Sequence, residues 1–65
     1  MKLTEQIKEE IKSFNTTLGG IDIDDAHEQT LDHLIDNDIV DLSDDEDGDQ
    51  YEELSNLVYE FMGTL

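Results

Sequence analysis

No lysine or arginine follows Lys12 in this chain of 65 residues. The first 12 residues hold three Lys and three Glu, so the formal net charge of −16 falls entirely on residues 13–65. Carboxylates repel one another and lose hydration when they are buried, so any fold must keep these groups at the surface. The chain can therefore form only a small core inside a highly acidic surface.

The length suffices for a single small domain, residues 1–65. A chain of this size buries only about 60% of the surface that its unfolded form exposes, so its stability is marginal. Leu, Ile, Val and Phe nevertheless make up 18 of the 65 residues. That share exceeds the roughly 20% below which chains tend to be disordered, and the regular spacing of these residues also favours a folded domain.

Apolar residues at spacings of three and four predict a first helix over residues 3–18. Its apolar face consists of Leu3, Ile7, Ile11, Phe14 and Leu18. Thr4 is a suitable N-cap, and Gly19 with Gly20 ends the helix. Two Glu–Lys pairs three residues apart are placed to interact across a turn: Glu5 with Lys8, and Glu9 with Lys12.

A second helix is expected to begin after Asp24 and Asp25, either of which can cap it. Asp25 with Glu28 also has the spacing of a capping box. The helix should end within residues 36–38, where weak helix formers cluster. Its expected apolar side is Ile23, Ala26, Thr30, Leu31, Leu34 and Ile35.

A third helix is predicted over residues 49–63. Apolar residues at alternating spacings of three and four form a near-heptad seam: Tyr51, Leu54, Val58, Phe61 and Leu65, with Leu57 and Met62 beside them. Acids occupy its first turn, where negative charge suits the helix dipole.

These elements predict a mostly α fold, a small three-helix domain. Residues 21–23 alternate and residues 39–42 are rich in β-formers, which is compatible either with a short two-stranded ribbon, making the fold α+β, or with apolar loops over the bundle. The core of such a domain is thin. The apolar stripes of the first and third helices therefore favour a homodimer.

Several environments and partners are disfavoured by the composition. No apolar run reaches the length of about 18 residues that a membrane span needs, and the start MKLTEQIKEE lacks the apolar core of a signal peptide. The chain contains no Cys, so a reducing cytoplasm is expected. Nucleic acid and anionic lipid should both be repelled, so we expect no direct nucleic-acid binding and no membrane binding.

The acidic loop before the third helix invites comparison with a calcium site. Setting Gly48 as the invariant glycine of an EF-hand loop places suitable oxygen ligands along residues 43–49. The bidentate Glu that should close the loop is replaced by Leu54. A solvated acidic loop is therefore favoured over a weak calcium site.

Catalytic and cofactor chemistry find little support in the sequence. His27 and His33 are six residues apart and fall on different helix faces, so they read as surface or boundary residues rather than metal ligands. Acyl carrier proteins are also small, acidic and helical, but none of Ser13, Ser43 and Ser55 lies in their Asp-Ser-Leu motif. We expect no enzymatic activity, no cofactor and no metal.

Four acids of the second helix follow spacings of three, four and four: Asp25, Glu28, Asp32 and Asp36. This places them in one outward row with a rise of about 4.5–6 Å between neighbours, while duplex DNA presents one phosphate per about 3.4 Å on each strand. Such a row would resemble a phosphate backbone to a surface rich in Lys and Arg. Further expected binding residues are Asp38, Asp41, Asp44, Asp45, Glu46, Asp47, Asp49, Glu52 and Glu53.

With this row, and with the acidic segment IVDLSDDEDGDQYEE, the chain resembles the small DNA-mimic inhibitors of bacteriophages. These include anti-restriction proteins, uracil-DNA glycosylase inhibitors, anti-CRISPR proteins and inhibitors of the nucleoid protein HU. The resemblance is one of class: a short, Cys-free, helical and acidic chain. It implies competition with nucleic acid for a basic host protein, often as a dimer, with HU or a CRISPR effector as the expected target.

Two other readings compete with mimicry. A surface selected for solubility alone needs a net charge of only about two to eight in a small domain. An antitoxin or immunity-type protein would bind one basic toxin by shape, through a few acids and an apolar hot spot, so its affinity would resist salt.

Overall fold

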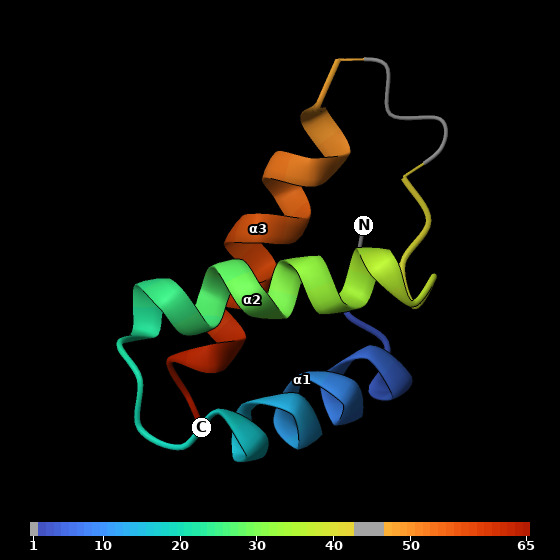
Figure 1. Cartoon of the computed structure of the whole chain (residues 1–65). Helices are drawn as coiled ribbons and strands as arrows, with labels where there is room; N and C mark the ends of the chain where they lie inside the picture. Colours follow the sequence, from blue (N-terminus) through green and yellow to red (C-terminus); the bar gives the residue numbers. More distant parts are fainter. Residues whose placement is uncertain (1, 43–46) are drawn as a thin grey trace.

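A computed structural model describes residues 2–42 and 47–65. It contains three α-helices, α1 (Glu5–Leu18), α2 (Ile23–Asp36) and α3 (Asp49–Met62). Every pair of helices is in contact, and α3 crosses α2 steeply (Figure 1). The prediction of a small three-helix domain is thus confirmed, and the described ranges hold no strand. None of these helices is long and apolar enough to cross a membrane.

Both ends of α1 follow the sequence prediction. The Ile7 N–H donates to Thr4 Oγ1 at 3.2 Å, so Thr4 is the N-cap. Gly19 follows the helix in the left-handed conformation with φ 62°, where a Cβ would be strained. A single residue of this helix, Ile11, is fully buried.

The start of α2 differs from the prediction. Its N-cap is Asp22, whose carbonyl accepts from the Ala26 N–H at 2.9 Å. Asp24 and Asp25 therefore already lie in the first helical turn, and the expected capping box at Asp25 is wrong. Asp22 makes no side-chain capping bond. Ile23, expected on the core side, is 42% exposed because it lies at the very start of the helix.

The end of α2 is a Schellman turn. The Ile39 N–H donates to the Leu34 carbonyl at 3.0 Å, and the Asp38 N–H donates to the Ile35 carbonyl at 3.2 Å. This turn folds the chain back, so that Val40 is buried and Ile39 packs against the core. Residues 39–42 therefore pack as an apolar loop over the bundle, one of the two expected alternatives, and form no ribbon with residues 21–23.

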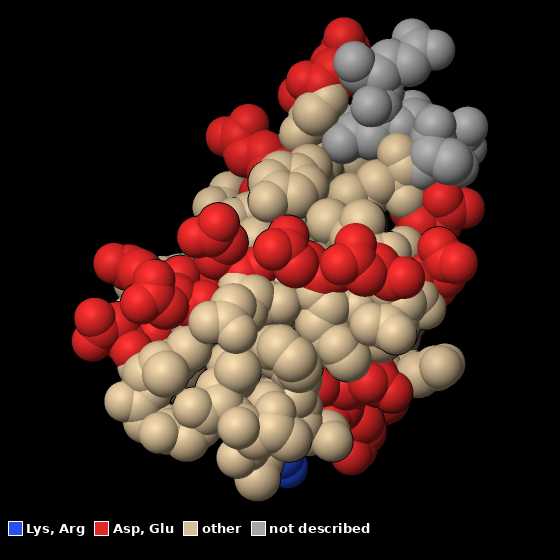
Figure 2. All heavy atoms as spheres, in the orientation of Figure 1, with Lys and Arg blue, Asp and Glu red and all other residues tan. Residues whose placement is uncertain are grey.

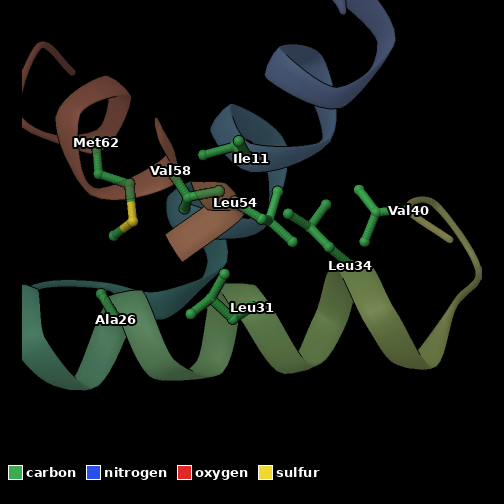
Figure 3. Packing of buried hydrophobic residues seen from close by; sticks show 8 residues of the cluster. All are labelled: Ile11, Ala26, Leu31, Leu34, Val40, Leu54, Val58 and Met62. Atoms are coloured by element: carbon green, nitrogen blue, oxygen red, sulfur yellow. The ribbon is translucent and has the colours of Figure 1, made fainter. Parts of the chain in front are cut away.

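The core draws on all three helices and on the segment after α2, whose side chains converge in Figure 3. Its buried apolar members are Ile11, Ala26, Leu31, Leu34, Val40, Leu54, Val58 and Met62. The predicted seam of α3 is wrong at its two ends, since Tyr51 is 42% and Leu65 57% exposed. Met62, one turn after Val58, is the last core residue of α3.

A polar contact lies inside this core. Thr30 is fully buried, and its hydroxyl donates to the Ala26 carbonyl at 2.6 Å. Asn15 Nδ2 donates to Thr30 Oγ1 at 3.2 Å and to the Ile11 carbonyl at 2.7 Å. Because the Asn15 amide has two N–H groups, both bonds can form together. These hydrogen bonds link α1 to α2 and fix how the two helices are aligned along their axes.

Candidate functional site

Acidic side chains form a row along the outer face of α2. Asp25, Glu28, Asp32 and Asp36 are all exposed, and we call these four residues the α2 row. Figure 2 shows acidic spheres crossing the molecule along α2, above a largely uncharged area over α1. The row is outward because the opposite side of the same helix supplies Ala26 and Leu34 to the core. The outward row of acids that their spacing predicts on this helix is thus confirmed.

The structure also places most of the other predicted binding residues at the surface. Those described and exposed are Asp38, Asp41, Asp47, Asp49, Glu52 and Glu53. Asp44, Asp45 and Glu46 lie outside the described residues. Two acids follow α2 directly, while four lie before or within the first turns of α3. The predicted binding residues that the structure describes therefore form two groups, one along and directly after α2 and one at the N-terminal end of α3.

Among the described residues after α1, three further exposed acids were not among the predicted binding residues. Asp22 is the N-cap of α2 and lies three residues before Asp25, so it extends the α2 row by one position. Asp24 lies in the first turn of α2, and Glu60 lies seven residues after Glu53 on α3. The spacing of Asp22 was visible in the sequence, but it was hidden by the expectation that α2 starts later.

The α2 row has no cationic partner among the described residues. None of its four carboxylates takes part in an ion pair there. Lys8 lies instead over Phe61, with its Nζ 6.0 Å from the ring centroid. The predicted ion pairs of Glu5 with Lys8 and of Glu9 with Lys12 are not formed in the described structure. Positive charge from α1 therefore does not neutralise the row.

His27 makes a contact between helices. Its Nε2 lies 2.8 Å from the Ser55 carbonyl oxygen and 3.3 Å from Ser55 Oγ, and its ring meets Tyr59 edge-on with centroids 5.2 Å apart. A carbonyl oxygen only accepts hydrogen bonds, so Nε2 carries a hydrogen and donates it. The same nitrogen cannot then take a proton from Ser55, which argues against a Ser–His nucleophile at this place.

His33 makes the contact between α2 and α1, as His27 does between α2 and α3. Its ring stacks on Phe14, and its Nε2 lies 3.5 Å from Glu10 Oε2. Both histidines are half-buried at helix boundaries, as the sequence suggests. Among the described residues no group of three or more His, Cys, Asp or Glu side chains is arranged to hold a metal ion. The predicted alternative of a calcium loop at residues 43–49 lies largely outside the described residues.

The surface that this geometry builds is suited to binding through charge. It offers a regular row of exposed carboxylates along α2 and a second acidic group at the N-terminal end of α3. No protein-family model, curated protein or solved structure matches the chain.

Proposed function

We propose that this protein binds the basic nucleic-acid-binding surface of another protein and blocks that surface, acting as a mimic of the phosphate backbone. The single observation that carries the proposal is the α2 row, whose exposed carboxylates share one helix face and form no ion pair with any residue that the structure describes. A surface of Lys and Arg that neutralises phosphates would accept such a row and release counterions from both sides.

The geometry of the row supports this reading. From Asp25 to Asp36 the helix rises about 16 Å along its axis, and neighbouring charges are separated by about 4.5–6 Å along that axis. DNA carries one phosphate per about 3.4 Å on each strand, so the row is less dense than one strand. The acids before and within the first turns of α3 add a second group that a broad basic surface can reach.

The energetic cost of the row is a second support. Glu28 and Asp32, and Asp32 and Asp36, are like charges four residues apart, which destabilises a helix by about 0.2–0.5 kcal/mol per pair. A Lys at any of these positions would have turned repulsion into attraction. The acidic surface is therefore not explained by stability, and solubility requires only about half of this net charge or less.

The proposed target is a basic protein of a bacterial cytoplasm. The resemblance to bacteriophage DNA-mimic inhibitors makes the nucleoid protein HU the first choice and a CRISPR effector the second. In either case the chain competes with nucleic acid for the same surface and binds no nucleic acid itself. It performs no reaction and needs no cofactor.

A second candidate function rests on exposed apolar side chains beside the acids. Ile23, the first residue of α2, is 42% exposed, and Ile21, which precedes the helix, is 39% exposed. Tyr59 is 45% exposed on α3. The Tyr59 ring contacts the ring of His27, and His27 lies one helical turn after Ile23 on α2. Tyr59 on α3 is therefore close to the exposed apolar residues at the start of α2. An apolar contact set among acids would suit an antitoxin or immunity-type protein that neutralises one basic toxin by shape.

Capture from a bacterial lysate at two salt concentrations separates the two functions. The tagged chain is incubated at about 100 mM and at about 500 mM NaCl, and the retained proteins are identified by mass spectrometry. Mimicry predicts that nucleic-acid-binding proteins are retained at low salt and lost at high salt. One partner that is retained at both concentrations would favour the antitoxin function.

Competition with DNA tests the proposed mechanism directly. Purified HU is bound to a fluorescent DNA duplex, and the chain is added while fluorescence anisotropy is recorded. Mimicry predicts that the duplex is released at stoichiometric amounts of chain. If the duplex stays bound while the chain is shown to bind elsewhere on HU, the proposal is wrong for this target.

A further inference from the structure

A shallow apolar groove lies between α1 and α3, on the side of the bundle away from α2. It measures about 420 Å³. Leu3, Leu57 and Phe61 line it, and all three are only partly buried. Lys2, Lys8 and Glu60 also border it. The three helices thus leave one apolar strip incompletely covered.

The charge around this groove differs from that of the remaining surface. A second hollow, lined by Lys12 and by Thr64 among others, adjoins the groove, since Thr64 borders both. All three lysines of the chain therefore lie along this side. The α2 row faces away from it across the bundle, because α2 packs against α1 and α3 through its opposite face.

We infer that the groove between α1 and α3 is the interface of a homodimer. Its occupant must cover the apolar strip of Leu57 and Phe61 and must meet both a positive and a negative rim. The same groove on a second copy supplies both an apolar strip and a rim of each charge. When a two-fold axis relates the copies, the lysines that border the groove of one copy face Glu60 of the other. A strongly basic partner would prefer the acidic faces, where no lysine competes.

Charge also selects this face for self-association. Two copies of −16 repel each other overall. This repulsion is smallest when the two copies meet through a surface whose local charge is balanced and their α2 rows point away from each other. Contact through the groove meets both conditions. The resulting dimer displays two α2 rows on its outer sides. The inference does not depend on the proposed target.

The size of the molecule limits how tight this dimer can be. A standard interface buries about 800 Å² per partner, whereas the whole chain exposes 4515 Å². The groove must therefore be extended by its rims on both helices to reach that area. We expect a dissociation constant of about 1–100 μM, corresponding to the weak end of specific association.

Sedimentation of the purified chain tests the inference. Samples from about 5 to 500 μM are measured at about 50 mM and at about 500 mM NaCl. We expect a reversible monomer–dimer equilibrium in which salt raises the dimer fraction, because screening weakens the repulsion while the apolar contact persists. A chain that stays monomeric throughout both series would overturn the inference.

A matched pair of variants places the interface. L57E puts a charge in the groove, while N56E adds the same charge at the neighbouring exposed position outside it. Circular dichroism first establishes that both variants are folded. L57E should reduce the association constant at least tenfold and N56E about twofold or less. Equal effects would show that the dimer, if present, uses another face.

Cross-linking of the unmodified chain covers the case in which L57E does not fold. A carbodiimide joins lysine amines to nearby carboxylates, and the chain has only Lys2, Lys8 and Lys12. In an equal mixture of unlabelled and 15N-labelled chains, the covalent dimer should contain links from Lys2 or Lys8 of one isotope form to Glu60 of the other, which links within one copy cannot produce. Links from the lysines to the α2 row instead would contradict the inference. The salt response separates this proposal from mimicry, since salt strengthens the dimer and weakens binding to a basic target.

Discussion

The imidazole of His33 on α2 stacks on the ring of Phe14 on α1, with centroids 4.3 Å apart and planes inclined by 13°. The Asn37 amide nitrogen lies 3.3 Å from His33 Nδ1, and Glu10 Oε2 lies 3.5 Å from its Nε2. The ring is therefore held from both edges while its face covers Phe14. This contact joins the last turn of α2 to α1 outside the main core.

We predict that H33A lowers the free energy of unfolding by about 1–2 kcal/mol, because stacked aromatic pairs contribute about 0.5–1.5 kcal/mol beyond their buried area. H33F keeps the stacking and loses the polar contacts, so it should remain within about 0.5 kcal/mol of the natural chain. Urea unfolding followed by circular dichroism measures both. If H33F is as unstable as H33A, the polar contacts rather than the stacking stabilise this place.

Asp38 is held in a conformation that suits glycine better. Its φ is 55°, in the left-handed region, at the position of the Schellman turn where Gly is usual. A Cβ in this region costs about 1–2 kcal/mol, less for Asp than for most residues. D38G should therefore stabilise the protein by about 0.5–1 kcal/mol, measured by thermal or urea unfolding.

Removal of charge must be separated from relief of strain at this position. D38A removes the same negative charge but keeps a Cβ, so it should be about 1 kcal/mol less stable than D38G. Equal stability of D38A and D38G would mean that the gain comes from reduced repulsion. It would also mean that the left-handed backbone costs nothing here.

The buried bond of Asn15 to Thr30 should couple α1 to α2 energetically. T30V keeps the shape of the side chain and N15A removes the donor, and each is expected to cost about 1 kcal/mol. Because the two residues contact each other, the double variant should cost about 0.5–1 kcal/mol less than the sum of the single changes. Urea unfolding of the four proteins measures this coupling. A strictly additive result would show that the bond does not contribute.

How far the sequence predicts the fold depends on whether its signals are local. α1 is predicted at both ends, because the hydroxyl of Thr4 and the flexibility of Gly19 act within a few residues of the helix ends. The start of α2 is not predicted, because Asp22, Asp24 and Asp25 are equally suitable N-caps. Only the packing of the helix in the folded protein determines that Asp22 is the cap. Tyr51 lies in the first turn of α3, and the start of this helix extends beyond α2 (Figure 1), so the side chain is exposed although its spacing predicts a core position.

The candidate site shows the same limit. The α2 row is predictable since its residues share one face of one helix. Its position relative to Asp49 and Glu52 on α3 depends on how the helices cross, and that crossing is set by the shared core, to which α2 contributes Leu34 and α3 contributes Leu54. The packing of Val40 was also not decided by the sequence, because the turn at Asp38 uses a residue that is uncommon there.

Repulsion within the acidic surface should make stability depend on salt. We predict that raising NaCl from about 20 to 300 mM increases the free energy of unfolding by about 1 kcal/mol, because screening shortens the reach of the repulsion to about 6 Å. In a domain of this size that corresponds to an increase in Tm of about 4–8 °C. Sodium sulfate also strengthens apolar burial, so NaCl is the appropriate salt. A Tm that does not change with salt would contradict the claim that like-charge repulsion at the acidic surface lowers the stability of the protein.

Neutralising the α2 row should stabilise the protein while it weakens target binding. The variant E28Q/D32N removes two neighbouring charges of the row, and relief of like-charge pairs should stabilise it by about 0.5–1 kcal/mol. Under the proposed function, its affinity for HU, the first proposed target, should fall, and the slope of log K against log salt should decrease in magnitude by about one to two, since about two fewer charges are matched. Fluorescence anisotropy at several salt concentrations measures the slope.

The control is E5Q/E9Q, which removes two like charges at the same spacing on α1. Both residues are exposed, and neither belongs to the α2 row. This variant should bind HU with a salt slope close to that of the natural chain. Equal loss in both variants would mean that only the total charge is recognised, and the α2 row would then have no special role. A loss confined to E28Q/D32N, in a protein that has become more stable, would assign the row to binding, because unfolding cannot explain that loss.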